Sequence, residues 1–238
     1  MKTALLVALL AMGAAQASVA QTCRQALALG LDVSGSVDAR EYRLQLSGLA
    51  TALNSSAVRA ALLEQPEAPV ELLVFEWSGP QEQTTLVPWT RITDAQTLTD
   101  VTEVLGNVQR REGSAPGTAL GVAMMVGAKM LAQRGQCWRR TLDISGDGKS
   151  NLGPRPRNIK PALASEGITI NALVIGADNP ANGDIRQSEI AELSAYFTAE
   201  VIVGPDAFVE VALGFEDYAA AMERKLLREL DGLIVSMR

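Results

Sequence analysis

The feature that most constrains the fold of this chain is an apolar segment, residues 27–31, that runs directly into a cluster of oxygen-bearing side chains. A short continuous apolar segment, bounded by glycine and followed by a helix-like pattern, is typical of a central strand in a parallel sheet. Asp32, Ser34 and Ser36 then place one carboxylate and two hydroxyls at alternate positions. Magnesium and similar hard cations bind oxygen ligands of this kind. The segment therefore predicts a buried strand with one wall of a metal site at its end.

The same polar residues also have an ordinary structural interpretation. Serine, aspartate and glycine are common in turns and helix caps at strand-to-helix junctions. Taken alone, the pattern fits a metal-binding loop and a polar turn about equally well. Other segments of the chain are needed to decide between the two interpretations.

Strand-like and helix-like segments alternate along the chain. Strands are expected at 69–77, 84–89, 138–145, 168–176 and 199–203 after the first one, and helices at 38–53, 94–110, 118–131, 158–166, 188–195 and 208–233. This alternation predicts an α/β fold with three layers, a mostly parallel central sheet with helices on both faces. Such folds bind ligands beyond the carboxyl ends of their strands. Asp32, Thr118 and Asp147 should therefore converge on one rim.

Three of the polar residues have competing structural roles. Asp38 with Glu41 forms a capping-box pattern, so we interpret Asp38 as a helix cap rather than a ligand. Thr118 stands at a helix start, where a plain N-cap is the alternative to a ligand. Asp143 falls inside an apolar strand, and a buried carboxylate needs partners, for which we expect Arg139 or Arg140.

Composition excludes several function classes. The 238 residues are 47% apolar and 20% charged, which suits one large or two small globular domains, and the net charge of −6 gives no basic footprint for nucleic acid. The chain contains no histidine, which removes Ser-His-Asp triads, Cys-His pairs and histidine-bearing zinc sites. Any metal is expected to be held by oxygen.

The amino terminus predicts export. Lys2 precedes an apolar run at 4–12, and small residues follow up to Ala20, which is the pattern of a secretory signal peptide. We predict a signal peptide at 1–20, a domain at 21–238 and a periplasmic or secreted protein without a membrane span. An uncleaved anchor would need a longer apolar run, and acylation of Cys23 would need a smaller residue than Thr22 before it.

The two cysteines, Cys23 and Cys137, favour one disulfide in an exported protein, and two unpaired thiols are the alternative. Cys23 lies nine residues before Asp32, and Cys137 lies ten before Asp147. If their strands are parallel neighbours, both cysteines lie at the same end of the sheet.

Together, Asp32-x-Ser34-x-Ser36, Gly117-Thr118 and Asp147-Gly148 resemble the three-part metal-ion-dependent adhesion site (MIDAS) of von Willebrand factor type A domains. The segments DVSGSVD, EWSG and ISGDG resemble, more specifically, an uncharacterised, DUF1194-like family of exported bacterial proteins. The resemblance covers nearly the whole mature chain and implies a von Willebrand factor type A, Rossmann-like fold. The motif usually has its third aspartate directly after Thr or Ser, whereas Gly146 intervenes here and shifts Asp147 by about one residue.

The resemblance implies a set of metal ligands. Ser34, Ser36 and Thr118 would bind Mg²⁺ (or Mn²⁺) directly through their hydroxyls. Asp32 and Asp147 would act directly or through water. Few direct carboxylates leave the cation electron-poor, so that it can accept an acidic group from a protein or peptide partner.

We therefore expect an exported, metal-dependent binding module without catalytic residues. The alternative is a magnesium-dependent hydrolase or phosphatase-like enzyme that uses Asp32. Enzymes of the haloacid dehalogenase type commonly carry a second aspartate two positions later, where this chain has Ser34. A purely structural domain is the third possibility.

Overall fold

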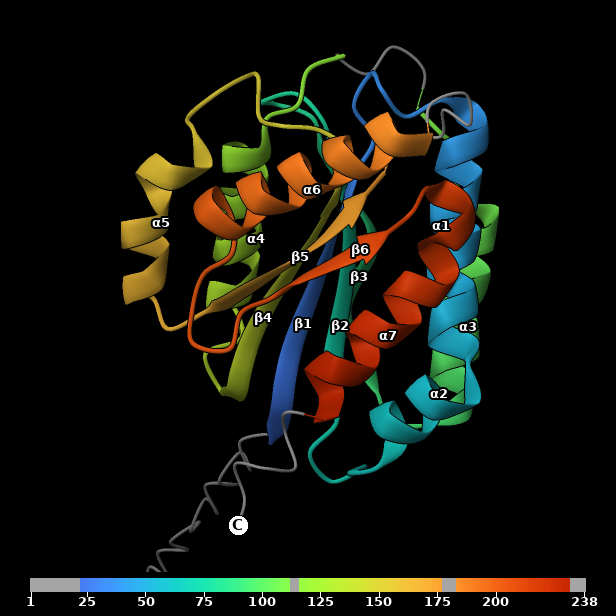
Figure 1. Ribbon diagram of the computed structural model, residues 1–238. Coiled ribbons are helices and arrows are strands. Elements are labelled where there is room, and N and C mark those ends of the chain that lie inside the picture. The colour runs from blue at the N-terminus through green and yellow to red at the C-terminus, as the bar shows by residue number, and fades with distance from the viewer. Residues whose placement is uncertain (1–21, 112–115, 177–182, 232–238) are drawn as a thin grey trace, which may run out of the picture.

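The computed structural model describes residues 22–111, 116–176 and 183–231, and the predicted signal peptide therefore lies outside the described residues. Strands and helices alternate along this part of the chain (Figure 1). The strands are β1 (Cys23–Asp32), β2 (Val70–Trp77), β3 (Gln83–Ile92), β4 (Cys137–Gly146), β5 (Thr169–Ile175) and β6 (Val209–Ala212). The helices are α1 (Ala39–Asn54), α2 (Ser56–Leu63), α3 (Ala95–Asn107), α4 (Leu120–Ala132), α5 (Pro156–Ser165), α6 (Gly183–Glu200), the 3-10 turn η1 (Phe215–Asp217) and α7 (Tyr218–Asp231).

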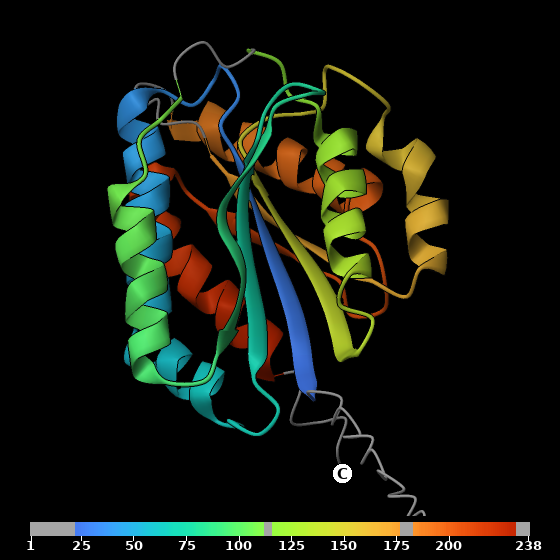
Figure 2. The same ribbon diagram turned by 180° about the vertical axis from the view of Figure 1, so that it is seen from behind.

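The strands form one sheet in the order β3-β2-β1-β4-β5-β6. All neighbours pair in parallel except β3, which runs antiparallel to β2 at the edge. Helices α1, α2, α3 and α7 cover one face, and α4, α5 and α6 cover the other (Figures 1 and 2). The predicted three-layer α/β architecture is confirmed.

Each face of the sheet has its own apolar core, and β1 contributes to both. Leu27, Leu29 and Leu31 join the core under α1 and α7, while Ala26 and Ala28 join the core under α4 and α6. Successive side chains of a strand point to opposite faces. Both faces of β1 are therefore buried. This explains why its sequence is continuously apolar and does not alternate between apolar and polar residues.

The start of α1 shows the predicted capping box. The Asp38 carboxylate accepts hydrogen bonds from the backbone of Arg40 and Glu41, and the Glu41 side chain accepts one from the Asp38 backbone N–H. The interpretation of Asp38 as a cap is confirmed.

Two expectations for the carboxyl-terminal third are wrong. Residues 199–203 do not form the last strand, because α6 continues to Glu200 and only Val203 makes an isolated bridge to Ile170. The last strand is β6, which lies inside the stretch expected to be one helix from 208 to 233. That helix begins only at Tyr218 and packs against α1.

Asp143 finds its partner on another element than expected. Neither Arg139 nor Arg140 pairs with it; instead Lys225 Nζ of α7 lies 2.8 Å from Asp143 Oδ2 and 2.6 Å from Glu229 Oε1. All three side chains are buried. Burial lowers the pKa of Lys225, but the two carboxylates more than offset this effect and leave it above its ordinary value. This cluster fastens α7 to the sheet.

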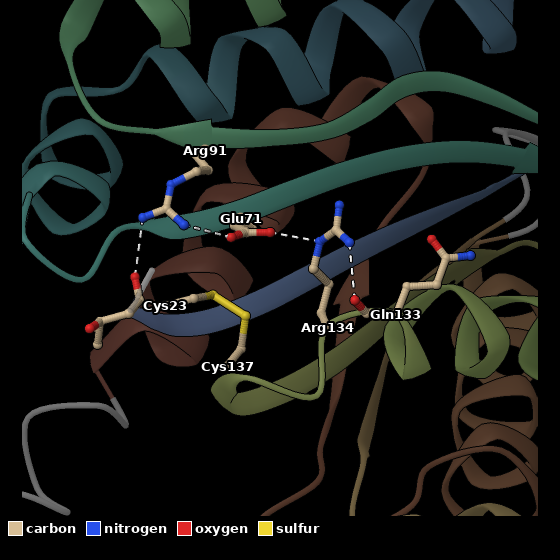
Figure 3. The surroundings of a disulfide bond; sticks show 7 residues. Cys23, Glu71, Arg91, Gln133, Arg134 and Cys137 are labelled. Atoms are coloured by element: carbon tan, nitrogen blue, oxygen red, sulfur yellow. Dashed lines mark hydrogen bonds and ion pairs between the residues drawn. A yellow bond between two sulfur atoms is a disulfide. The ribbon is translucent and has the colours of Figure 1, made fainter. Parts of the chain in front are cut away.

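The predicted disulfide is present. Cys23 and Cys137 are bonded, with their Cα atoms 4.5 Å apart, because β1 and β4 are parallel neighbours and place the two residues in register. Beside the disulfide, Glu71 lies between Arg91 and Arg134, at ion-pair distances of 2.9 and 2.7 Å (Figure 3). The disulfide therefore links the amino ends of the two central strands, β1 and β4.

Candidate metal centre

Four of the predicted site residues lie at the carboxyl ends of the two central strands, Asp32, Ser34 and Ser36 at the end of β1 and Asp147 just after β4, and Thr118 lies just before α4. After β1 the chain turns to α1 on one face of the sheet, and after β4 it turns to α5 on the other (Figures 1 and 2). Loops that diverge in this way leave a crevice between them, where open α/β sheets bind ligands.

Asp32 is fully buried, with 0% of its surface exposed. Its Oδ1 accepts a hydrogen bond from the backbone N–H of Ser34, at 2.8 Å. The turn is also tied to its neighbours, because Val33 N donates to Trp77 O and Gly35 N donates to Pro116 O. The backbone thus fixes the Asp32 carboxylate beneath the loop.

Three hydroxyls lie above Asp32, and they come from two segments of the chain. Ser34 Oγ is 3.3 Å from Ser36 Oγ and 3.3 Å from Thr118 Oγ1. Hydrogen bonds between hydroxyls are normally about 2.7–2.8 Å long, so these oxygens are grouped without being tightly bonded to one another. Ser34 and Thr118 are buried, whereas Ser36 is exposed.

Thr118 is not a plain helix cap. Ala119 stands at the N-cap of α4, where no side chain caps the helix. The Thr118 backbone N–H donates to Asn151 Oδ1 at 2.8 Å, and Ala119 N donates to Ser78 O. These bonds fix the backbone while the Thr118 hydroxyl turns to Ser34.

Asp147 joins the group despite the inserted glycine. Gly146 is the last residue of β4, and Asp147 is the first residue beyond it. Ser36 Oγ donates a hydrogen bond to Asp147 Oδ1 at 2.8 Å. A Cβ atom at position 146 would lie 3.4 Å from Asp32 Oδ2 and 3.2 Å from Phe197 Cζ. The glycine therefore leaves room for the Asp32 carboxylate, and the structure brings all five predicted residues together.

The charge of Asp147 adds to the cost of ionising Asp32. Burial, followed by the charge of Asp147, raises the pKa of Asp32 to about 8, although the Ser34 hydrogen bonds oppose the rise. Burial also raises the pKa of Asp147, against the hydrogen bond from Ser36. Two carboxylates in this position favour a positive charge between them.

These residues fit a divalent cation. No described residue donates a hydrogen bond to the buried Asp32 Oδ2, and a buried carboxylate oxygen normally has a partner. Two carboxylates and three hydroxyls are the oxygen ligands that magnesium prefers. Around an octahedral magnesium ion with bonds of about 2.1 Å, neighbouring ligand oxygens lie roughly 3 Å apart, close to the 3.3 Å between the hydroxyls here.

A second group of potential ligands does not fit a metal. Cys23, Glu71 and Cys137 have ligand atoms within 4.8 Å of one another. Both sulfurs are in the disulfide, and Glu71 is already paired with two arginines (Figure 3). Thiolates rather than disulfides bind metal ions, so these three residues offer no metal site.

Two residues that position the site were not found from the sequence. Asn151 accepts the Thr118 N–H, and Gln45 Nε2 of α1 donates to the Asp32 carbonyl at 2.9 Å. Gln45 is fully buried in an otherwise apolar helix face. A polar side chain in such a position is a signal that could have pointed to it, whereas Asn151 reads as an ordinary loop residue.

A family model described as "Protein of unknown function (DUF1194)" matches residues 22–234. No curated protein matches the chain. Among solved structures, proximal thread matrix protein 1 from the mussel byssus is 17% identical with a TM-score of 0.58, and the match covers 88% of this chain and 48% of that one. The chain thus spans about half the length of that protein. A further structure of the mussel protein is described as having a zinc-occupied MIDAS motif, at 18% identity over 88% of this chain and 48% of that one, with a TM-score of 0.58.

Two bacterial structures are also similar. The pilus adhesin SpaC from Lactobacillus rhamnosus GG is 16% identical, with a TM-score of 0.57 over 90% of this chain and 31% of that one. The conserved hypothetical protein BatB from Bacteroides thetaiotaomicron is 16% identical, with a TM-score of 0.53 over 88% of this chain and 98% of that one. These proteins contain von Willebrand factor type A domains, and at such identities the likeness shows the fold alone.

Proposed function

The chain belongs to the DUF1194 family of proteins of unknown function, and we propose that it is an exported binding module that captures a carboxylate of a protein or peptide partner through a Mg²⁺-type adhesion site. Ser34, Ser36 and Thr118 would hold the ion through their hydroxyls. Asp32 and Asp147 would hold it directly or through water. A bound Mg²⁺ or Mn²⁺ supplies a Lewis-acidic position that an acidic side chain of the partner can occupy.

The observation that carries this proposal is the buried Asp32 Oδ2, to which no described residue donates a hydrogen bond, together with the three grouped hydroxyls of Ser34, Ser36 and Thr118. The site is graded from buried Asp32 to exposed Ser36, so its outer side faces solvent and can receive a partner. The mussel protein with a zinc-occupied MIDAS motif and the pilus adhesin support a binding role for this fold.

The geometry favours a binding module over a hydrolase that uses Asp32 as its nucleophile. A nucleophile must touch its substrate, but Asp32 is fully buried below Ser34. Position 34 offers a hydroxyl and no second carboxylate that could serve as the general acid.

Export is supported by the disulfide, because such bonds persist in oxidising compartments. None of the described helices has the length and apolar character that a membrane crossing requires. Fractionation of cells that express the full chain, with amino-terminal sequencing of the mature protein, tests both the compartment and a cleavage near Ala20. A cytoplasmic, unprocessed protein would contradict export.

Metal binding is tested by calorimetric titration of Mg²⁺ and Mn²⁺ into metal-free protein. We expect saturable binding that Asp32→Ala abolishes. Asp100→Ala is the matched control, because Asp100 is an exposed aspartate on α3. A wild-type protein that binds neither ion at millimolar concentration would refute the proposal.

A further inference from the structure

A pocket of about 270 Å³ opens directly beside the candidate metal centre. Asp147 and Gly148 form its wall on the side of the metal centre, and Ile175, Ile190 and Leu193 are its apolar lining residues. Ile175 comes from β5, and Ile190 and Leu193 come from α6, two elements that pack against each other (Figure 1). Asp147 therefore belongs to both the metal centre and the pocket.

The charges at the pocket do not suit a second acidic group. The pocket is lined by two acidic residues, Glu189 and Glu192, and by one cation, Lys149. Lys149 already forms an ion pair with Glu192 at 2.5 Å. Because this ion pair is largely exposed, its electrostatic interactions are weak, and we expect it to add little to the affinity for a ligand. What remains for a ligand is apolar surface.

The backbone of Leu213 lies beside the pocket at Gly176. Leu213, which follows β6, is 59% exposed. Its carbonyl oxygen would lie 3.0 Å from a Cβ atom at Gly176, which lines the pocket.

We infer that the pocket receives an aliphatic side chain adjacent in sequence to the acidic residue that the metal centre captures. The partner is then a peptide segment in which an aspartate or glutamate is flanked by a residue such as leucine. This inference rests on the proposed function and specifies its ligand. Because the pocket and the metal centre share Asp147, the two sites are close enough for side chains that are neighbours in one peptide to reach both. Burial of a leucine-sized side chain raises affinity by roughly tenfold or more.

The test uses acetylated, amidated peptides of the form Gly-X-Glu-X-Gly, in which both X residues are glycine, leucine or lysine. They are titrated into the mature protein at saturating Mg²⁺ and followed by NMR. We expect the leucine peptide to bind at least about tenfold more tightly than the glycine peptide. Equal affinities, or a lysine peptide that binds as tightly as the leucine peptide, would overturn the inference.

A pair of variants locates the effect. A Cβ atom at Gly148 would meet nothing within 4 Å, so Gly148→Leu narrows the pocket without displacing the chain. It should lower the affinity of the leucine peptide relative to that of the glycine peptide, and Mg²⁺ titration of the variant reports separately on the metal centre. Gly135→Leu is the control, because position 135 is equally open but lies two residues before β4, at the other end of the sheet. An unchanged leucine preference in Gly148→Leu overturns the inference.

Mg²⁺ titration of the same samples distinguishes failure of the pocket as a ligand subsite from failure of the metal centre itself. If Mg²⁺ binds but the leucine peptide shows no preference, the pocket is not a ligand subsite and the metal centre stands. If Mg²⁺ does not bind, the proposed function fails and this inference fails with it.

Discussion

Ser36 Oγ donates a hydrogen bond to Asp147 Oδ1 across a separation of 111 residues, and this contact closes the candidate metal centre. It joins the loop after β1 to the loop after β4. The inserted residue, Gly146, is the last residue of β4, so Asp147 still reaches the other four site residues. The contact explains how the centre keeps five residues together although its third motif is one residue longer.

The hydroxyl of Thr118 is expected to be needed for metal binding. Thr118→Val keeps the shape and the backbone bond to Asn151 but removes the hydroxyl that lies 3.3 Å from Ser34. We expect Mg²⁺ affinity to fall by at least about tenfold. Thr118→Ser retains the hydroxyl and should bind within a few-fold of wild type in the same calorimetric titration. Equal affinities for Thr118→Val and wild type would remove Thr118 from the ligand set.

The stability of the metal-free protein should fall as pH rises. Because the pKa of Asp32 is raised from 3.8 to about 8, the folded state keeps a proton that the unfolded chain releases. This contribution is complete below about pH 4 and is lost between about pH 4 and pH 8. Thermal unfolding should therefore occur at lower temperature at pH 8 than at pH 5, and Mg²⁺ should reduce the difference.

Asp32→Asn tests the origin of this pH dependence, since it removes the titrating group. The variant should reduce the difference between pH 5 and pH 8, to which the raised pKa values of Asp143 and Asp147 also contribute, whereas Asp100→Asn should retain the full difference. The same slope in Asp32→Asn and wild type would show that another group is responsible.

The ammonium group of Lys225 should stabilise the fold strongly. Lys225→Met leaves Asp143 and Glu229 buried without their cation, a change that typically costs about 3–5 kcal/mol. Urea unfolding should report a loss of this size. Arg40→Met, which breaks an exposed ion pair with Glu216, should cost about 1 kcal/mol or less. Similar losses in the two variants would show that the buried cluster does not fasten α7.

The disulfide should affect stability without affecting the metal centre. The double variant Cys23→Ala with Cys137→Ala removes a link between positions 114 residues apart and should lower the free energy of unfolding by about 2–5 kcal/mol. Because the disulfide lies at the amino ends of β1 and β4, Mg²⁺ affinity below the unfolding temperature should match that of wild type. A large loss of affinity would show that the two ends of the sheet are coupled.

The sequence predicted the parts of the fold that local patterns determine. The apolar segment before Asp32, the capping box at Asp38 and the cysteine spacing each depend on nearby residues or on strand order, and all three expectations are confirmed. The five site residues were likewise chosen from short motifs, and the structure brings them into contact.

Long-range packing decided the parts that were wrong. The partner of Asp143 is Lys225 of α7, and no local pattern connects these two positions. The short strand β6 precedes α7 by only a few residues, so its four residues were merged into the longer helical pattern. Asn151 and Gln45 were missed because their roles are to position Thr118 and Asp32 through the backbone.

The position of β1 has a mechanical consequence. Its amino end carries the disulfide, and its carboxyl end carries Asp32, so the disulfide and the proposed binding point lie at opposite ends of one strand (Figure 1). A pull between a captured partner and the amino terminus would run along this strand. The hydrogen bonds to β2 and β4 flank it on both sides and would be loaded together in shear rather than opened one after another.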